Sequence, residues 1–299
     1  MTTYRTSYNQ RDVTNYVTNV SPTDTPFYSM IGNKGAVSRK IESLTDSNAS
    51  ASSTNAAIEG ATLANTALND RSVEENWTQI FTKVIEVSGS QEVVLKYGDI
   101  KSEMKYQISK AYKELGTDVE KTLITGTSAS GASGTARSLG GVIEKITTNT
   151  ATADVTGDTW VGTSNDSLAL FEEKFNDMFD QAFETGHNMN TVFVGGKLKR
   201  RISKLSTKVT RNIDAEKKTQ ILVINVYDSD FGTMNIVLDR YVPDTTILAV
   251  DISGWKTAYL RRFKQFPLAK VSDSTRAAIV GELTLDAKTE KMGAKIVAS

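Results

Sequence analysis

The feature that most constrains this chain is a polar segment of about thirty residues, 45–75, set between two segments of strand-like composition. Ser, Thr, Asn, Ala and Asp dominate it, and its run DSNASASSTNAA cannot build a hydrophobic core. Segments of this length without periodic structure are uncommon inside a compact domain. Composition leaves open a disordered linker and a projecting hairpin whose order depends on a neighbouring chain. The strand-like flanks favour the hairpin.

The downstream flank is NWTQIFTKVIEVS, residues 76–88, and it carries two conflicting patterns. Its apolar residues have the spacing of an amphipathic helix; they are Trp77, Ile80, Phe81, Val84 and Ile85. Eight of its thirteen residues are nevertheless β-branched or aromatic, which is the composition of a strand. Upstream, residues 35–44 form a second strand candidate. Residues 1–34 predict an extended arm that ends in a small apolar plug, after turns at Pro22 and Pro26. The plug comprises Phe27, Tyr28, Met30 and Ile31.

Composition excludes several classes of function. The 299 residues carry 35 basic and 35 acidic side chains, so no field of one sign attracts nucleic acid or an anionic membrane. The chain has no cysteine and one histidine, His187, which argues against cysteine nucleophiles and against Cys- or His-rich metal sites. We therefore expect no cofactor and no metal. No apolar run of about 18 residues predicts a membrane span.

Helices and strands alternate along the rest of the chain. Residues 101–125 predict a helix of about 25 residues, roughly 37 Å long, with Asp99 as the N-cap and Gly126 at its end. A second helix starts at Asn165, with Phe183 among its apolar stripe, and a short basic helix follows Gly196. The strand candidates span residues 142–146, 191–194, 219–227, 234–239, 246–251, 257–262 and 277–285. Mixed or antiparallel sheets with interleaved helices give the class α+β.

Three motifs have simpler explanations than catalysis. Asp230-Phe231-Gly232 matches a kinase triplet but has the residues of a hairpin turn. Gly126 and Gly131 have the spacing of a phosphate loop but follow a helix and lack the Lys-Ser/Thr pair. His187 follows a helix and is predicted to be a capping or surface residue; a hydrolase using His187 remains an alternative. The sequence has one basic cluster, and it can be interpreted in two ways. It is either a solvated helix face or a surface that contacts DNA or an acidic partner. Its members are Lys197, Lys199, Arg200, Arg201, Lys204 and Lys208.

Several short segments, in this order and spacing, resemble the major capsid proteins of tailed bacteriophages, which have the Hong Kong 97-like fold. The resemblance covers nearly the whole chain. It is carried by SPTDTPF (21–27), NWTQIF (76–81), VSG (87–89), Glu114-Leu115, DVE (118–120), Arg137 with Gly140-Gly141, YDSDFG (227–232), Leu260-Arg261, PLAK (267–270) and ELTLDAK (282–288).

The resemblance implies a division of the chain. It predicts an N-terminal arm (1–34), an extended β-hairpin loop (35–90) and an axial domain (141–242). The peripheral domain would comprise 91–140 and 243–299, with the 101–125 helix as its spine. The segment 76–88 would be the returning strand of the loop, roughly 43 Å long. Its reach over a neighbour implies inter-subunit contacts, for which we select Arg39, Glu42, Glu59, Arg71, Trp77 and Phe81.

The implied function is self-assembly. Pentamers and hexamers would form an icosahedral shell, assembled in the bacterial host cytoplasm and retained in the virion. The expected partners are further copies, portal and scaffolding proteins, a decoration protein, and double-stranded DNA held by weak non-specific contact. No lysine lies between Lys40 and Lys83, so we predict no covalent cross-link through the loop. The absence of a long helical leader predicts a separate scaffolding protein. Two alternatives within this class are an encapsulin-like nanocompartment and a tail-tube subunit.

Overall fold

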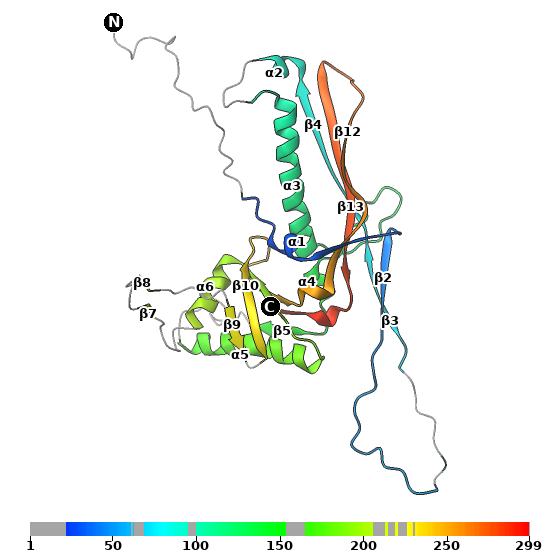
Figure 1. Cartoon of the computed structure of the whole chain (residues 1–299), viewed down its shortest axis with the longest axis vertical. Coiled ribbons are helices and arrows are strands. Elements are labelled where there is room, and N and C mark those ends of the chain that lie inside the picture. Colours follow the sequence, from blue (N-terminus) through cyan, green and yellow to red (C-terminus); the bar gives the residue numbers. More distant parts are fainter. Residues whose placement is uncertain are drawn as a thin grey trace.

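A computed structural model describes residues 22–60, 62, 69–94, 100–153, 165–205, 213–214, 219–220, 226–229 and 231–298. Its parts are a long helix against a four-stranded sheet, a six-stranded sheet with two helices, and a hairpin that projects away from both (Figure 1). The combination of separate helices and mixed sheets confirms the α+β class.

The four-stranded sheet has the order β1-β12-β13-β4. Its strands are β1 (Gly32–Gly35), β12 (Trp255–Pro267), β13 (Ser274–Ala287) and β4 (Gln79–Ser88), and only β1 pairs in parallel. Helix α3 (Glu103–Thr125) lies along β4 and buries the stripe Ala111, Leu115, Val119 and Leu123. Ser102 caps it, accepting from the Lys105 N–H, whereas the expected cap Asp99 lies outside the described residues. Gly126 ends the helix as predicted.

The six-stranded sheet has the order β5-β14-β11-β6-β10-β9. Its strands are β5 (Thr150–Ala153), β14 (Gly293–Ala298), β11 (Thr246–Val250), β6 (Thr191–Val194), β10 (Gly232–Leu238) and β9 (Val226–Ser229). One face packs on α5 (Asn165–Glu184) and α6 (Gly196–Leu205), and the other face joins the core under α3. The fully buried Phe175, Met178 and Phe179 confirm the apolar stripe of α5, but Phe183 is 59% exposed and does not belong to it.

Shorter elements complete the described chain. They are α1 (Pro26–Met30), α2 (Gly89–Val93), α4 (Val142–Lys145), the pair β7 (Ile213–Asp214) and β8 (Thr219–Gln220), and 3-10 turns at Ile252–Gly254 and Glu290–Met292. The plug prediction is confirmed for Phe27, which is fully buried, and for Ile31, which is nearly so, while Tyr28 is partly buried. Met30 is 39% exposed and does not belong to the plug. The strand expected at 142–146 is wrong, because these residues form α4. A short apolar run does not distinguish a strand from a helical turn.

The expected division at residue 243 does not coincide with the sheets. Strands β11 and β14 both follow that residue, yet they lie in the six-stranded sheet with β6 and β5. Between them the chain crosses to the other sheet and forms β12 and β13. The segment 255–287 is therefore the part of the C-terminal region that lies in the same sheet as β4, beside α3.

The segment 76–88 is extended as predicted, but it is not one strand. Strand β3 (Ser72–Trp77) pairs with β2 (Lys40–Thr45) in the projecting hairpin, whereas β4 pairs with β13 in the main sheet. Thr78 joins the two strands. The predicted 43 Å returning strand is therefore wrong. The misleading helical spacing arises because β4 has apolar residues on both faces: Phe81 and Ile85 inward, Ile80 and Val84 outward at 45% and 55% exposure.

Candidate subunit interface

The projecting hairpin has two different faces, set by the register of β2 and β3. Residues directly opposite each other share a face. On the inner face, Ser43 donates to the Asp286 carboxylate at 3.2 Å and Asn76 is buried. The outer face carries the opposed pairs Lys40–Trp77, Glu42–Glu75 and Leu44–Val73. Leu44 is 69% exposed and Val73 51%, so two apolar side chains lie adjacent and uncovered by their own chain.

Asn76 fixes the root of the hairpin. Its Nδ2 donates to the carbonyls of Gly140 and Leu285, each at 2.9 Å, and its Oδ1 accepts the Gly140 N–H at 2.8 Å. The amide is 5% exposed. All these bonds are shielded from water. Loss of one partner would therefore leave a buried polar group unsatisfied and lower the stability of the fold. The hairpin is therefore held rigidly at one end while its other end extends from the body (Figure 1).

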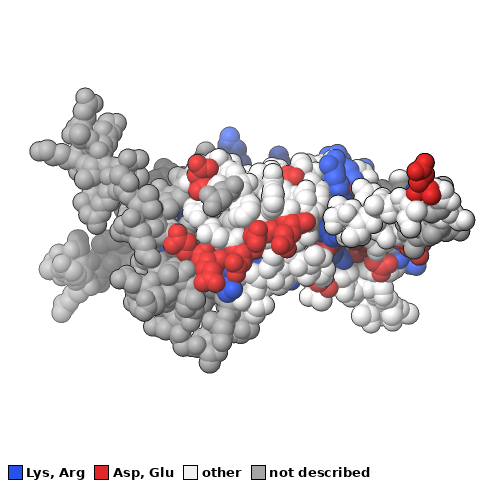
Figure 2. Space-filling view, turned by 90° about the horizontal axis from the view of Figure 1, so that it is seen from below, with Lys and Arg blue, Asp and Glu red and all other residues white. Residues whose placement is uncertain are grey.

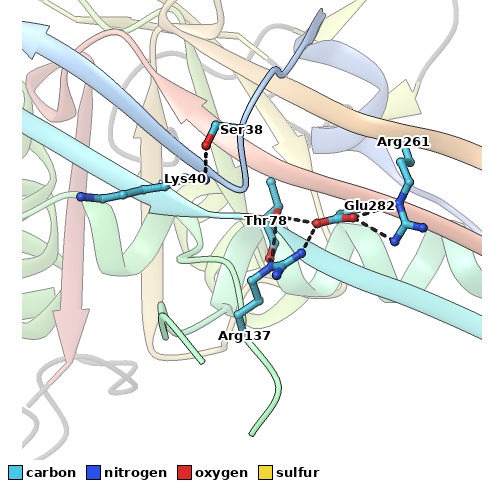
Figure 3. Close-up of polar contacts among 6 residues, drawn as sticks. All are labelled: Ser38, Lys40, Thr78, Arg137, Arg261 and Glu282. Atoms are coloured by element: carbon cyan, nitrogen blue, oxygen red, sulfur yellow. Dashed lines mark hydrogen bonds and ion pairs between the residues drawn. The ribbon is translucent and has the colours of Figure 1, made fainter. Parts of the chain in front are cut away.

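Glu282 on β13 makes a second anchor, to Thr78, Arg137 and Arg261 (Figure 3). One carboxylate oxygen accepts from Thr78 Oγ1 at 2.7 Å and from Arg137; the other accepts from Arg261 Nη2 at 2.9 Å. Arg137 Nε also donates to the Thr78 carbonyl at 2.9 Å. Burial raises the pKa of Glu282, but the three donors outweigh it and hold the pKa below its usual value. The carboxylate is therefore charged and ties Thr78 to two other segments.

Most of the residues selected from the sequence as contacts do lie on the hairpin or its root. Glu42 and Glu59 are exposed, Arg71 forms an exposed ion pair with Asp46 at 3.3 Å, and Trp77 lies 5.7 Å from Lys40 Nζ. Arg39 is exposed and lines an open cavity of about 400 Å³ beside Ile80, Arg137 and the loop 130–136.

Phe81 is the exception among these residues. It is 6% exposed and packs into the core beside Phe263, with ring centroids 6.5 Å apart. Its own chain covers it. Leu44 and Val73, by contrast, were not selected, because their shared face depends on a strand register that the sequence alone does not give.

The basic cluster is only partly on the surface. Arg201 is 7% exposed with its guanidinium 5.0 Å from the Phe171 ring, and Lys199 donates to the Ile236 carbonyl at 3.2 Å. Burial lowers the pKa of Lys199. Lys197 and Arg200 are exposed, and Lys197 pairs with Asp244 at 2.7 Å. The side chain of Lys204 lies outside the described residues, as does Lys208. A solvated face is therefore correct for only part of the cluster.

The neighbouring helix α5 carries the opposite charge. Glu173, Asp177, Asp180 and Glu184 follow one side of it at spacings of three and four residues, and none is buried. Helix α5 forms the lower edge of its region in Figure 1, and Figure 2, seen from below, shows a row of acidic side chains there. This face would repel a phosphate backbone.

No catalytic constellation forms in the described part of the chain. The His187 N–H donates to the Ala182 carbonyl at 3.0 Å, which ends α5 as the capping interpretation predicts. The described residues contain no group of three or more His, Cys, Asp or Glu placed to hold a metal. The hairpin predicted around residues 230–232 is confirmed by the pairing of β9 with β10. None of the described helices is long and apolar enough to cross a membrane.

Comparison with known proteins decides the family. The family model described as "SU10 major capsid protein" matches residues 1–298. The chain belongs to the SU10 major capsid protein family. A curated relative, the "Major capsid protein" of Escherichia phage Phieco32, is 25% identical, covering 86% of this chain and 84% of the relative.

Solved structures place this family member in the Hong Kong 97-like capsid fold. The capsid of Myoviridae phage XM1 aligns with a TM-score of 0.64 at 12% identity, over 97% of each chain. The capsid of a native GTA particle aligns with a TM-score of 0.66 at 11% identity, over 98% of this chain and 96% of the other. A Synechococcus elongatus encapsulin aligns with a TM-score of 0.60 at 8% identity, over 97% of this chain and 91% of the other. At these identities the structures indicate the fold alone.

Proposed function

We propose that the chain is the shell subunit of a tailed-phage head, assembling with further copies into pentamers and hexamers of an icosahedral capsid around double-stranded DNA. The observation that carries this is the projecting hairpin, rigidly anchored at Asn76 and Glu282, with Leu44 and Val73 bare on its outer face. An isolated two-stranded hairpin is at best marginally stable in water. A second copy provides the surface that the outer face lacks.

In this assembly the hairpin and its root, with Arg39, Glu42, Glu59, Arg71 and Trp77, contact a neighbour. The hairpin of each subunit reaches a different surface on the next subunit, a head-to-tail contact that closes into rings. The region around α5 and α6 forms the axial domain, and α3 with β4, β12 and β13 forms the peripheral domain. We assign no enzymatic role to His187.

The other partners follow from the same proposal. Portal, scaffolding and decoration proteins would bind during or after assembly in the host cytoplasm. DNA contact would be weak and non-specific, because the chain has no net charge and the exposed part of the basic cluster reduces to Lys197 and Arg200 among the described side chains. The acidic side of α5 is consistent with a shell that does not hold its DNA tightly.

The test combines electron microscopy of particles with substitutions that place charges on the outer face of the hairpin. We expect closed polyhedral particles from the wild-type chain, with scaffold supplied if required. The double variant Leu44→Asp, Val73→Asp should retain its circular dichroism spectrum but form no particles, since two carboxylates would be buried without partners. Val37→Asp is the control, because Val37 is an exposed valine as well, at 101%, but lies outside the paired strands β2 and β3. Particle formation by the double variant would contradict the proposed contact.

Particle contents separate the phage shell from the nanocompartment, whose solved fold is also similar. Native particles that contain DNA support the phage head, whereas particles that contain only protein support a cargo shell. Tubes in place of closed shells would support the tail-tube alternative. Absorbance at 260 and 280 nm after nuclease treatment, together with negative-stain images, distinguishes all three.

A further inference from the structure

A buried carboxyl pair lies where the N-terminal segment meets the two sheets. Glu120 on α3 has no exposed surface. Its two oxygens accept the backbone N–H groups of Phe27 and Tyr28, each at 2.7 Å. The Phe27 ring packs edge-on against Phe193 of β6, with centroids 5.3 Å apart. Glu120 therefore fastens the segment 22–31 both to the helix and, through Phe27, to the six-stranded sheet.

Asp239 is the second member of the pair. It follows β10, is 1% exposed, and its carboxyl group interacts electrostatically with that of Glu120. Its Oδ1 accepts the Tyr241 N–H at 2.8 Å, while its Oδ2 is buried and has no donor among the described groups. Two ionised carboxylates can only accept, so a proton on one of them provides the missing donor.

The charged and titratable groups around the pair do not replace that proton. From α1, the Tyr28 hydroxyl bonds to the Tyr259 hydroxyl of β12. From the turn after β10, Arg240 pairs with Asp24 at 3.5 Å, and both are more than half exposed. Among the described residues, no ion pair joins a cation to Glu120 or Asp239. Burial, with a smaller effect of Asp239, raises the pKa of Glu120 to about 8, and burial also raises the pKa of Asp239.

We propose that Glu120 and Asp239 form a proton-held latch that fastens residues 22–31 to α3 and to the end of β10, and that loosens as the pH rises from weakly acidic to weakly alkaline. In the closed latch the pair retains a proton. Once the segment detaches and water enters, Glu120 ionises at the ordinary value for a carboxyl group. Opening therefore releases a proton, and rising pH favours it.

The pH window follows from linkage. The opening equilibrium grows by up to about tenfold per pH unit between the ordinary carboxyl pKa and the raised one. Above a pH of about 8 the closed latch has also lost its proton, so the dependence levels off. The latch is thus fully closed in acid and weakest on the alkaline side of neutral, which is the opposite of an ion-paired carboxylate.

Hydrogen–deuterium exchange of the full-length chain reads this latch directly, since the Phe27 and Tyr28 amides are donors to Glu120. We expect their protection, corrected for intrinsic exchange, to fall by up to about a hundredfold from pH 6 to pH 8 and then to level off. Amides of β6 in the core should hold their protection over the same range. An equal fall in β6 would mean global unfolding and would overturn the latch.

Three variants separate the latch from general destabilisation. Asp239→Asn provides an amide donor and leaves one carboxylate, so protection should persist. Its slope against pH should become shallower but not vanish, because burial still raises the pKa of Glu120. Glu120→Gln can accept with only one atom, so protection should be lower at every pH, and its slope should also be shallower because residue 120 no longer titrates. Asp118→Asn, exposed two residues earlier on α3, should keep the wild-type profile. A wild-type slope in Asp239→Asn would overturn the proposal. None of these readouts requires assembly, so the result is independent of the proposed capsid function.

Discussion

Glu282 takes its partners from three segments: Thr78 between β3 and β4, Arg137 in the loop after α3, and Arg261 in β12. The sequence shows Arg137 and Glu282 only as members of short segments typical of a family, with no role attached. Their roles depend on a sheet register and a loop path, which local sequence patterns do not specify. The same holds for Glu120 and Asp239, which are ordinary surface residue types until burial brings them together.

We expect Glu282→Gln to lower the free energy of unfolding by about 3 kcal/mol, since it removes the charge that two arginines share at a buried position. Urea unfolding of the unassembled chain, followed by tryptophan fluorescence, measures this. The control Asp46→Asn breaks the exposed pair with Arg71 and should change stability by about 0.5 kcal/mol or less. Equal effects of the two variants would contradict the anchor.

The Glu282 anchor also has a pH dependence of its own. The pKa of Glu282 is held below the ordinary value for a glutamate. The anchor therefore contributes fully to the free energy of unfolding when the pH is above the ordinary pKa, and this contribution is lost as the pH falls through the lowered pKa. We therefore expect the melting temperature of the wild-type chain to fall more steeply below a pH of about 4 than that of Glu282→Gln. Parallel melting curves for the two proteins would contradict this.

At the scale of elements, the sequence predicts best where periodicity is long. Helices α3 and α5 are where their long patterns place them. The short strands β6 and β11 are also where predicted, and every residue in each of them is buried. Prediction failed at short or two-faced segments, namely α4 and the break at Thr78. Strands β1, β5 and β14 were not predicted, because short segments of four to six residues acquire their structure from their sheet partners.

Helix α3 contains an interior glycine that lowers its stability. Gly116 lies in its interior, and a Cβ built there meets no atom within 4 Å. We expect Gly116→Ala to raise the free energy of unfolding by about 0.5–1 kcal/mol, because alanine loses less backbone entropy in a helix. The matched contrast is Gly281→Ala on β13, where a Cβ would lie 2.4 Å from the Phe263 ring and should destabilise the chain. Thermal melts of both variants check the signs.

At the scale of the whole molecule, the proposed hairpin contact determines what chemistry would join one subunit to the next. Its polar segment, residues 46–71, contains no lysine, and Lys40 at its root is already paired with Glu42 and Glu75. We therefore expect particles to dissociate into single chains on a denaturing gel, without heating-resistant ladders. Ladders in wild-type particles that persist in a Lys40→Arg variant would locate a cross-link elsewhere in the chain.

The whole-molecule division was less predictable than its elements, because the chain leaves the six-stranded sheet after β11 and re-enters it at β14. The chain crosses between the two sheets, and residues Phe193, Leu248 and the α3 residue Leu123 share one core, so the two sheets form one body.

The anchored hairpin has a mechanical consequence. The hairpin is attached to the rest of the subunit at one end only, and Asn76 and Glu282 hold that end. A sideways force on the far end becomes a torque at the root, where the bonds to Gly140, Leu285, Arg137 and Arg261 pass it to the loop after α3 and to the long strands β12 and β13. In the proposed shell, internal pressure would thus be borne by the stiffest parts of each subunit, and strain would spread across the wall instead of collecting at a flexible joint.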